Sequence, residues 1–498
     1  MRRRSLRRYL AIGGLLFLLY WYFVSPTSSS DKQSSIQKTK SYDVKGWCPL
    51  PPIPSGLKDG LQSSSKLESS DSLMLQVERL SAAVNVPTIN YQNNGKVGED
   101  IRWKVVAQFH TVLEKLFPLV HSHARVEKIN TYGLLYTFQG SSINTKPILF
   151  LAHQDIVPPG PTAKWIHHPF QGHYDGQYLW GRGAAYCKNN LIGLLSAMEA
   201  LLSQNFSPRR TIIFSFGFDA ETRGLQGAFH LSAHLEAHYG KNSMAMILDE
   251  GGTGIETLGD TVYALPAVTE KGYLDVTLEL QVPGGHSSSP PPHSGIGIMA
   301  EMIVELEKHP FKPRLTRGNP YRGVLECQVR YSPKEVEPWL KRDLLRSGSE
   351  ELLGMRLAES RGQGVRFSLQ TSQAIDAVHA GEKSNQLPSE VDLRVNYRIA
   401  PHDSIEAVKQ NILQSVKPIA RKYGLGIWGF GFEEDKTEEG LLVLDGRDGA
   451  EPAPISPTTL NNAVWELFSG TIRQVFEDVE VFKGKTVVPV GDINHGKP

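Results

Sequence analysis

Hydrophobic and polar residues follow one pattern in the first half of this chain and another after Tyr273. In the first half, segments with helical spacing, at residues 101–116 and 191–202, alternate with short apolar runs. Such runs are typical of strands buried on both faces of a parallel sheet. They occur at residues 147–152, 211–216 and 244–248. This order of strand, helix and strand predicts a doubly wound α/β fold.

After Tyr273 the hydrophobic residues alternate with polar ones. Residues 274–280 place Leu and Val at every second position, and residues 391–399 repeat the pattern. Strict alternation is typical of antiparallel strands with one buried and one exposed face. We therefore expect a second, α+β domain over residues 269–400, inserted into the first.

The N-terminus has a separate character. Five arginines precede an apolar run over residues 9–24. A cleaved signal peptide has the same order, but the bulky aromatic end of the run favours an uncleaved membrane anchor. Because basic residues stay on the cytosolic side, we expect residues 1–24 to be a cytosolic tail and anchor, and the rest of the protein to be lumenal. Residues 25–43 have the composition of a flexible stalk.

Composition narrows the classes of function. The chain of 498 residues is long enough for more than one domain. It has 53 Lys and Arg against 52 Asp and Glu, a net charge of +1, which does not favour a nucleic-acid partner. Three cysteines leave at least one unpaired, and no Cys-x-x-Cys occurs. A bound metal should therefore be held by His and carboxylates.

Polar residues cluster directly after each predicted parallel strand. The carboxyl ends of such strands meet at one edge of the sheet, where ligands bind. Each cluster alone could be a helix cap or a turn. Together they predict a metal or hydrolytic site of the catalytic zinc type, with an open position for water. The clusters are His153 with Asp155, Asp219 with Glu221, and Asp249 with Glu250.

Five motifs occur in order along the chain: His-Gln-Asp at 153–155, Gly-Arg-Gly-Ala at 181–184, Phe-Gly-Phe-Asp-x-Glu at 216–221, Leu-Asp-Glu-Gly-Gly at 248–252 and Gly-Gly-His-Ser-Ser at 284–288. This set resembles the motifs of the aminoacylase/carboxypeptidase zinc metallopeptidases, and among them the carboxypeptidase S-like, membrane-anchored vacuolar type of fungi. The resemblance implies a catalytic domain with two zinc ions, over residues 44–268 and 401–498, and identifies the inserted domain as a dimerisation (lid) domain. It also implies a homodimer that removes C-terminal residues from peptides, or cleaves N-acyl amino acids, with metal-activated water.

The resemblance also implies roles for residues near the metal. His153 and Asp249 would bind one zinc ion and Glu221 the other, while Asp155 would orient His153. Asp155 is thus the expected catalytic residue of this set.

Three further residues would contact the substrate. His286 would reach it from the lid of the other subunit, and Asn385 and Arg398 would bind its carboxylate, a role suited to a guanidinium group. Without the resemblance, Arg398 would be interpreted as an exposed strand residue and His286 as a turn residue.

Three positions depart from the family pattern. Tyr186 stands where an Asp bridges the two zinc ions, and Ala220 stands where a Glu takes a proton from water. His495 lacks the motif that surrounds the family's last zinc-binding His, so we assign it no role. Because loss of a general base costs about 10²–10⁴ in rate, the sequence also allows an impaired homologue that acts as a binding or dimerising partner.

Overall fold

The computed structural model describes residues 44–55, 61, 69–251, 254–346 and 348–494. The predicted anchor and stalk, residues 1–43, and His495 lie outside this range. The elements described below belong to one compact unit of the chain. Among the described residues, no helix is both long and apolar enough to cross a membrane.

The first domain is built on a five-stranded sheet in the order β1-β2-β6-β3-β7. The three predicted apolar runs form its parallel strands β3, β6 and β7, which confirms that interpretation. A β1–β2 hairpin completes the sheet, with β2 antiparallel to β6. The strands are β1 (Arg125–Ile129), β2 (Gly133–Phe138), β3 (Ile148–His153), β6 (Ile212–Gly217) and β7 (Met246–Leu248).

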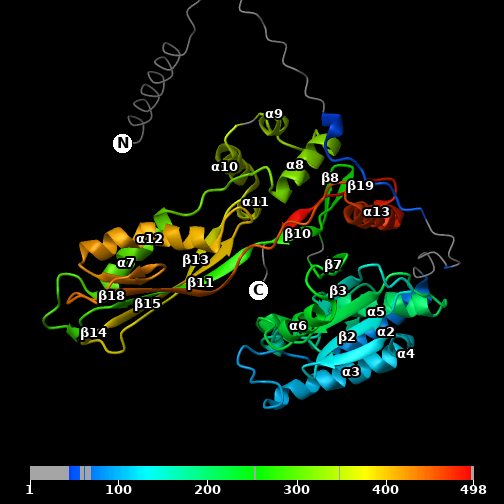
Figure 1. Cartoon of the computed structure of the whole chain (residues 1–498), viewed down its shortest axis with the longest axis horizontal. Coiled ribbons are helices and arrows are strands. Elements are labelled where there is room, and N and C mark those ends of the chain that lie inside the picture. The colour runs from blue at the N-terminus through cyan, green and yellow to red at the C-terminus, as the bar shows by residue number, and fades with distance from the viewer. Residues whose placement is uncertain (1–43, 56–60, 62–68, 252–253, 347, 495–498) are drawn as a thin grey trace, which may run out of the picture. The chain divides into compact units, whose positions relative to one another are not determined.

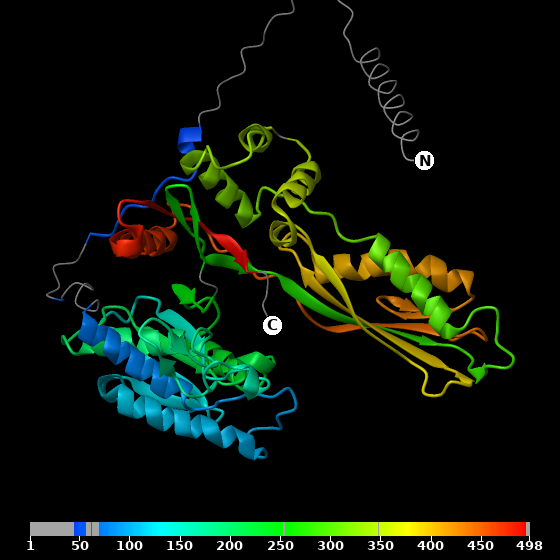
Figure 2. The same cartoon turned by 180° about the vertical axis from the view of Figure 1, so that it is seen from behind.

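Helices cover both faces of this sheet, as the doubly wound pattern predicts (Figures 1 and 2). Side chains of β2 alternate between the faces: Tyr136 packs with α2, α3 and α5, whereas Leu135 packs with α6. The predicted helix at 101–116 begins with a short 3-10 turn and continues as α3. The helices are α2 (Ser70–Val84), α3 (Lys104–Leu116), α4 (Pro118–His123), α5 (Lys188–Leu202) and α6 (Ala228–Tyr239).

The second domain is a six-stranded sheet in the order β13-β15-β11-β18-β16-β17. Strands β11 and β15 pair antiparallel over their full lengths, and Leu278 lies opposite Leu393. Burial alternates along both strands, and α7 (Gly295–Lys308) and α12 (Ile405–Lys422) pack on the buried face (Figure 1). The strands are β11 (Gly272–Gln281), β13 (Ser372–Ala380), β15 (Glu390–Ile399), β16 (Gly426–Gly429), β17 (Phe432–Glu433) and β18 (Leu441–Ala450).

The inserted domain does not end at residue 400, where we expected its boundary. Helix α12 and strands β16–β18 continue the same sheet and core to residue 450. Strand β18 hydrogen-bonds along β11, with Leu444 opposite Leu278. Sequence spacing did not predict this, because β18 returns to the sheet from a distant part of the chain.

The remaining elements lie outside the two large sheets. Strand β19 pairs with β9 and β20 pairs with β10, both in parallel. They are β8 (Ile255–Leu258), β9 (Thr261–Ala264), β10 (Ala267–Glu270), β19 (Thr486–Pro489), β20 (Asp492–Asn494), the hairpin β4 (His173–Tyr174) and β5 (Leu179–Trp180), α8 (Pro320–Tyr331), α9 (Leu340–Leu345), α10 (Glu350–Arg361), α11 (Gln363–Ser368) and α13 (Ala463–Asp478).

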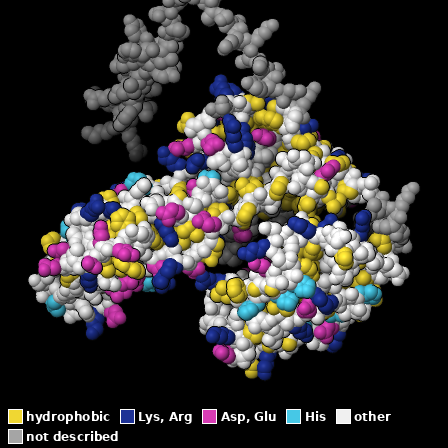
Figure 3. Space-filling view, viewed as in Figure 1, with side chains coloured by type: hydrophobic (Ala, Val, Ile, Leu, Met, Phe, Trp, Pro, Cys, Tyr) yellow, Lys and Arg dark blue, Asp and Glu magenta, His cyan; other side chains and the backbone are white. Residues whose placement is uncertain are grey.

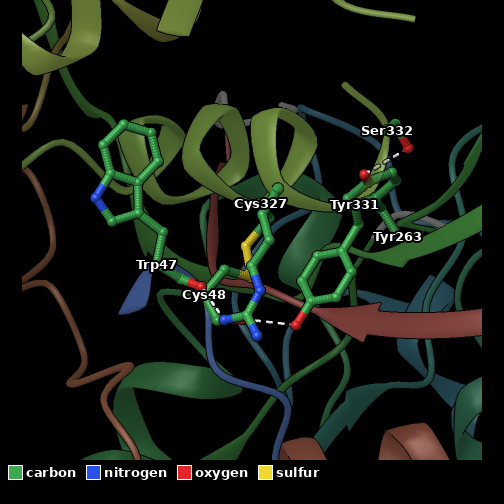
Figure 4. The surroundings of a disulfide bond; sticks show 7 residues. Trp47, Cys48, Tyr263, Cys327, Tyr331 and Ser332 are labelled. Atoms are coloured by element: carbon green, nitrogen blue, oxygen red, sulfur yellow. Dashed lines mark hydrogen bonds between the residues drawn. A yellow bond between two sulfur atoms is a disulfide. The ribbon is translucent and has the colours of Figure 1, made fainter. Parts of the chain in front are cut away.

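A disulfide joins Cys48, close to the start of the described chain, to Cys327 on α8 (Figure 4). The two cysteines are 279 residues apart in sequence. Hydrogen bonds support the link, because Tyr331 and Arg330 both donate to the Cys48 carbonyl oxygen. The cysteine left unpaired is Cys187, which is buried.

Basic and acidic side chains are interspersed on the face shown in Figure 3. This mixture reflects the nearly equal numbers of the two charge types, 53 and 52. On this face, neither sign gathers into one continuous patch.

Candidate metal centre

The predicted polar clusters meet at one edge of the first sheet. His153 is the last residue of β3, Glu221 lies in a 3-10 turn after β6, and Glu250 follows β7. Since these strands are parallel, their carboxyl ends open toward the same edge. The clusters are therefore within contact of one another although about 100 residues of chain separate the first from the last.

Asp155 connects His153 to the turn that follows β6. Its carboxylate is buried and lies 3.0 Å from His153 Nδ1. It also accepts hydrogen bonds from the backbone N–H groups of Ala220 (3.2 Å) and Glu221 (3.0 Å) and from Asn90 Nδ2 (3.1 Å). Burial alone would raise the pKa of Asp155, but the contact with His153 and these donors lower it. An ionised Asp155 therefore holds the His153 ring in one orientation.

The other nitrogen of His153 faces Glu250. The distance from His153 Nε2 to Glu250 Oε1 is 3.2 Å. Burial disfavours the charged imidazole, but carboxylates at both nitrogens outweigh burial and raise the pKa of His153 to about 10. Asp249, which we expected as the ligand beside His153, instead accepts a hydrogen bond from the backbone N–H of Glu250 at 2.8 Å. Side chains of adjacent residues point in different directions, so the strand end alone could not decide between the two.

Cys187 is the site residue that the sequence analysis missed. Its buried thiol donates to Glu250 Oε2, and its sulfur accepts from the backbone N–H of His153 at 3.5 Å. Burial, and then the Glu250 carboxylate, raise the pKa of this thiol. The absence of Cys-x-x-Cys led us to expect His and carboxylate ligands only. The signal that could have found Cys187 is its place inside the glycine-rich motif, next to Tyr186.

Tyr186 and Ala220 offer no carboxylate at the edge of the site. The Tyr186 ring packs edge-on against the His153 ring, with centroids 5.6 Å apart. Burial and the nearby Glu250 carboxylate raise the pKa of Tyr186, so its phenol stays neutral. The Ala220 methyl group is not ionisable. Glu221, the carboxylic acid next to Ala220, is partly buried, and this burial raises the pKa of its carboxyl group.

The donor set fits one metal ion. One ligand atom from each of His153, Cys187 and Glu250 lies within 4.8 Å of the other two. Three protein ligands with an open fourth position are typical of catalytic zinc. Within the described ranges, Glu221 belongs to no such group of three, so the residues present do not fit the second ion of a two-zinc site.

The predicted substrate-binding residues fall into two places. His286 and Asn385 are exposed neighbours at the β12 (Gly285–His286) and β14 (Gln386–Leu387) ladder, where Ser287 N donates to Asn385 O at 3.2 Å. Arg398 lies opposite Tyr273 near the other end of β15, roughly 26 Å from Glu390 at 3.3 Å per residue. Arg398 is on the metal-centre side, because both it and Asp249 interact electrostatically with Glu270.

Comparison with known proteins agrees with this architecture. The model of peptidase family M20/M25/M40 matches residues 149–492. Carboxypeptidase S of Saccharomyces cerevisiae is 38% identical over 411 residues, which cover 81% of this chain and 71% of that protein. The chain therefore belongs to peptidase family M20/M25/M40, a family of metal-dependent hydrolases, and is a carboxypeptidase S-like member of it. This confirms the resemblance inferred from the motifs.

Two further comparisons extend the picture. The N-fatty-acyl-amino acid synthase/hydrolase PM20D1 of Bos taurus is 29% identical over 428 residues, which cover 84% of this chain and 77% of that protein. The solved structure of the Saccharomyces cerevisiae di-peptidase Dug1p has a TM-score of 0.53 at 13% identity, with 86% of each chain covered. At that identity the likeness concerns the fold alone, and it agrees with a catalytic domain that carries an inserted lid domain.

Proposed function

We propose that this chain is a zinc hydrolase that cleaves an amide bond next to a free carboxylate. Two substrate classes share that chemistry: the C-terminal end of a peptide and an N-acyl amino acid. The similarity to carboxypeptidase S supports the first, and the similarity to PM20D1 supports the second. In both, Arg398 would pair with the carboxylate through its guanidinium group.

The observation that carries this proposal is the His153 ring held between Asp155 and Glu250 at the edge of the parallel sheet. A zinc ion held there would supply an acidified water and polarise the scissile carbonyl group. Asp155 keeps His153 Nε2 directed at the metal position. Glu250 provides an oxygen ligand from the neighbouring strand. Together these residues fix where the reaction takes place.

The site has no carboxylate at the position expected for the general base. Ala220 stands where a carboxylate would remove a proton from the attacking water, and the neutral Tyr186 phenol does not replace it. A missing general base lowers the rate by about 10²–10⁴. We therefore propose slow hydrolysis. The same observation favours the second candidate, a homologue that binds carboxylate ligands or a partner subunit without turnover.

We further propose a homodimer and a lumenal, vacuolar location with an N-terminal membrane anchor. The exposed positions of His286 and Asn385 support a role toward a second subunit. The Cys48–Cys327 disulfide supports an oxidising compartment, because such bonds are rare in the cytosol.

Restoring the missing carboxylates tests the proposal. Ala220→Glu alone, and together with Tyr186→Asp, should raise kcat for a blocked dipeptide or an N-acyl amino acid by about 10²–10⁴. Ala233→Glu, at an exposed position on α6, is the matched control and should leave kcat unchanged. The measurement is steady-state hydrolysis at saturating substrate with zinc present. Fast wild-type turnover that Ala220→Glu does not increase would contradict the impairment. Inactivity of every variant, with carboxylate binding retained, would favour the binding partner.

A further inference from the structure

Cys187 lies in the candidate metal centre and has no disulfide partner. The other two cysteines form the disulfide, and Cys187 is fully buried, so no cysteine elsewhere in the chain is left to pair with it. It stands at the N-cap of α5, a 15-residue helix. The backbone N–H of His153 donates to the sulfur.

The geometry around Cys187 fits a tetrahedral zinc ion. With bonds of about 2.3 Å to sulfur and 2.0–2.1 Å to nitrogen or oxygen, ligand atoms lie about 3.3–3.7 Å apart. His153 Nε2 and Glu250 Oε1 are 3.2 Å apart, and the sulfur contacts the second oxygen of Glu250. A small spreading of the three groups would therefore admit the ion. The three side chains come from β3, the start of α5 and the loop after β7.

We propose that His153 Nε2, the Cys187 thiolate and a Glu250 oxygen hold a single zinc ion, with the fourth position open. On binding, the Cys187 thiol and the charged His153 ring each release one proton to solvent, and the sulfur and Nε2 take the metal in place of those protons, so two protons leave per ion bound. This site replaces a two-zinc centre by one ion with a sulfur ligand. It shares its metal with the proposed hydrolysis but concerns binding alone.

A second carboxylate group in the described chain provides the control. Glu279, Glu390 and Asp392 lie close together on the lid sheet, but they offer only carboxylates and none of them is fully buried. Catalytic zinc sites draw at least part of their ligand set from His or Cys. Glu390→Gln should therefore leave zinc content and affinity unchanged.

Zinc X-ray absorption of the full-length protein tests the proposal directly. We expect about one zinc per chain, with one sulfur at about 2.3 Å and nitrogen or oxygen at about 2.0–2.1 Å. Cys187→Ser should abolish the sulfur signal. In competition with a chromophoric chelator, it should also weaken zinc binding by more than about 100-fold, the upper end of the loss for removing an outer-shell partner. Cobalt substitution should give a thiolate charge-transfer band in the wild type and in Glu390→Gln.

The wild-type spectrum decides the question even if Cys187→Ser does not fold. A zinc shell of nitrogen and oxygen only, two zinc ions per chain, or no zinc would each overturn the proposal. Hydrolysis with no sulfur in the shell would refute this ligand set and leave the proposed function standing. A sulfur ligand without hydrolysis in any variant would support this ligand set and refute the proposed function.

Discussion

The Cys48–Cys327 disulfide should be a major source of stability, and the double variant Cys48→Ser with Cys327→Ser tests this. The bond joins residues 279 apart, so it removes a very large loop from the freedom of the unfolded chain. For a loop of that length, the chain-entropy relation gives about 5.6 kcal/mol at 25 °C. Measured disulfides typically contribute 2–4 kcal/mol, because the unfolded state keeps some structure.

The surroundings of the bond favour a loss near the upper end of the measured range. Tyr331 donates to the Cys48 carbonyl at 3.0 Å (Figure 4), and Arg473 donates to the Pro51 carbonyl at 3.0 Å; neither hydrogen bond involves the cysteine sulfurs, so we expect both to persist without the disulfide. The folded state therefore keeps its shape, and the change falls on the unfolded chain. We expect the double variant to lose about 3–5 kcal/mol.

Urea unfolding followed by tryptophan fluorescence measures this loss as a lower midpoint. Reductant provides the matched control: it should move the wild type to the midpoint of the double variant and leave the double variant where it is. Equal midpoints for wild type and double variant would refute the reasoning. So would thiol labelling that finds three free cysteines in the unfolded, unreduced chain, because the bond predicts a single one, Cys187.

Two further predictions concern buried positions. Burial lowers the pKa of Lys188 to about 7, so the folded state favours the neutral amine and stability should rise with pH from about 7 to 10.5. Lys188→Met should remove a slope of about 1.4 kcal/mol per pH unit, measured by urea unfolding at pH 7.5 and 9.5; equal slopes would contradict this. Gly272→Ala should cost about 1–3 kcal/mol, because its Cβ would lie 2.5 Å from the Ala450 oxygen. Gly193→Ala, on an open face of α5, should instead stabilise by about 0.5–1 kcal/mol in thermal unfolding, and equal shifts for both variants would contradict the steric argument.

The sequence predicted where the polar clusters meet better than it predicted which side chains contact one another there. His153 and Glu221 follow strands whose apolar runs are visible in the sequence, and parallel strands must end at one edge. Their meeting could therefore be expected. Asp249 and Glu250 are adjacent after the same strand, and only the direction of each side chain separates them. That direction depends on the turn after β7, which apolar periodicity does not report.

The lid domain shows the same division. Alternation along residues 274–280 and 391–399 predicted β11 and β15 as paired strands with one exposed face, and their register confirms this. The boundary at residue 400 was placed too early, because β18 joins β11 from residues 441–450. The sequence of β18 predicts a strand but does not indicate which sheet that strand joins after α12.

The sequence by itself determined the local elements, the doubly wound order and the family, because each of these depends on spacing or on short motifs read along the chain. The tertiary structure alone decided that Cys48 pairs with Cys327 and that Cys187 lies against Glu250 and His153. These contacts join residues 34–279 positions apart. Their formation depends on how the sheets, helices and crossings pack in three dimensions, and a local pattern holds no information about that packing.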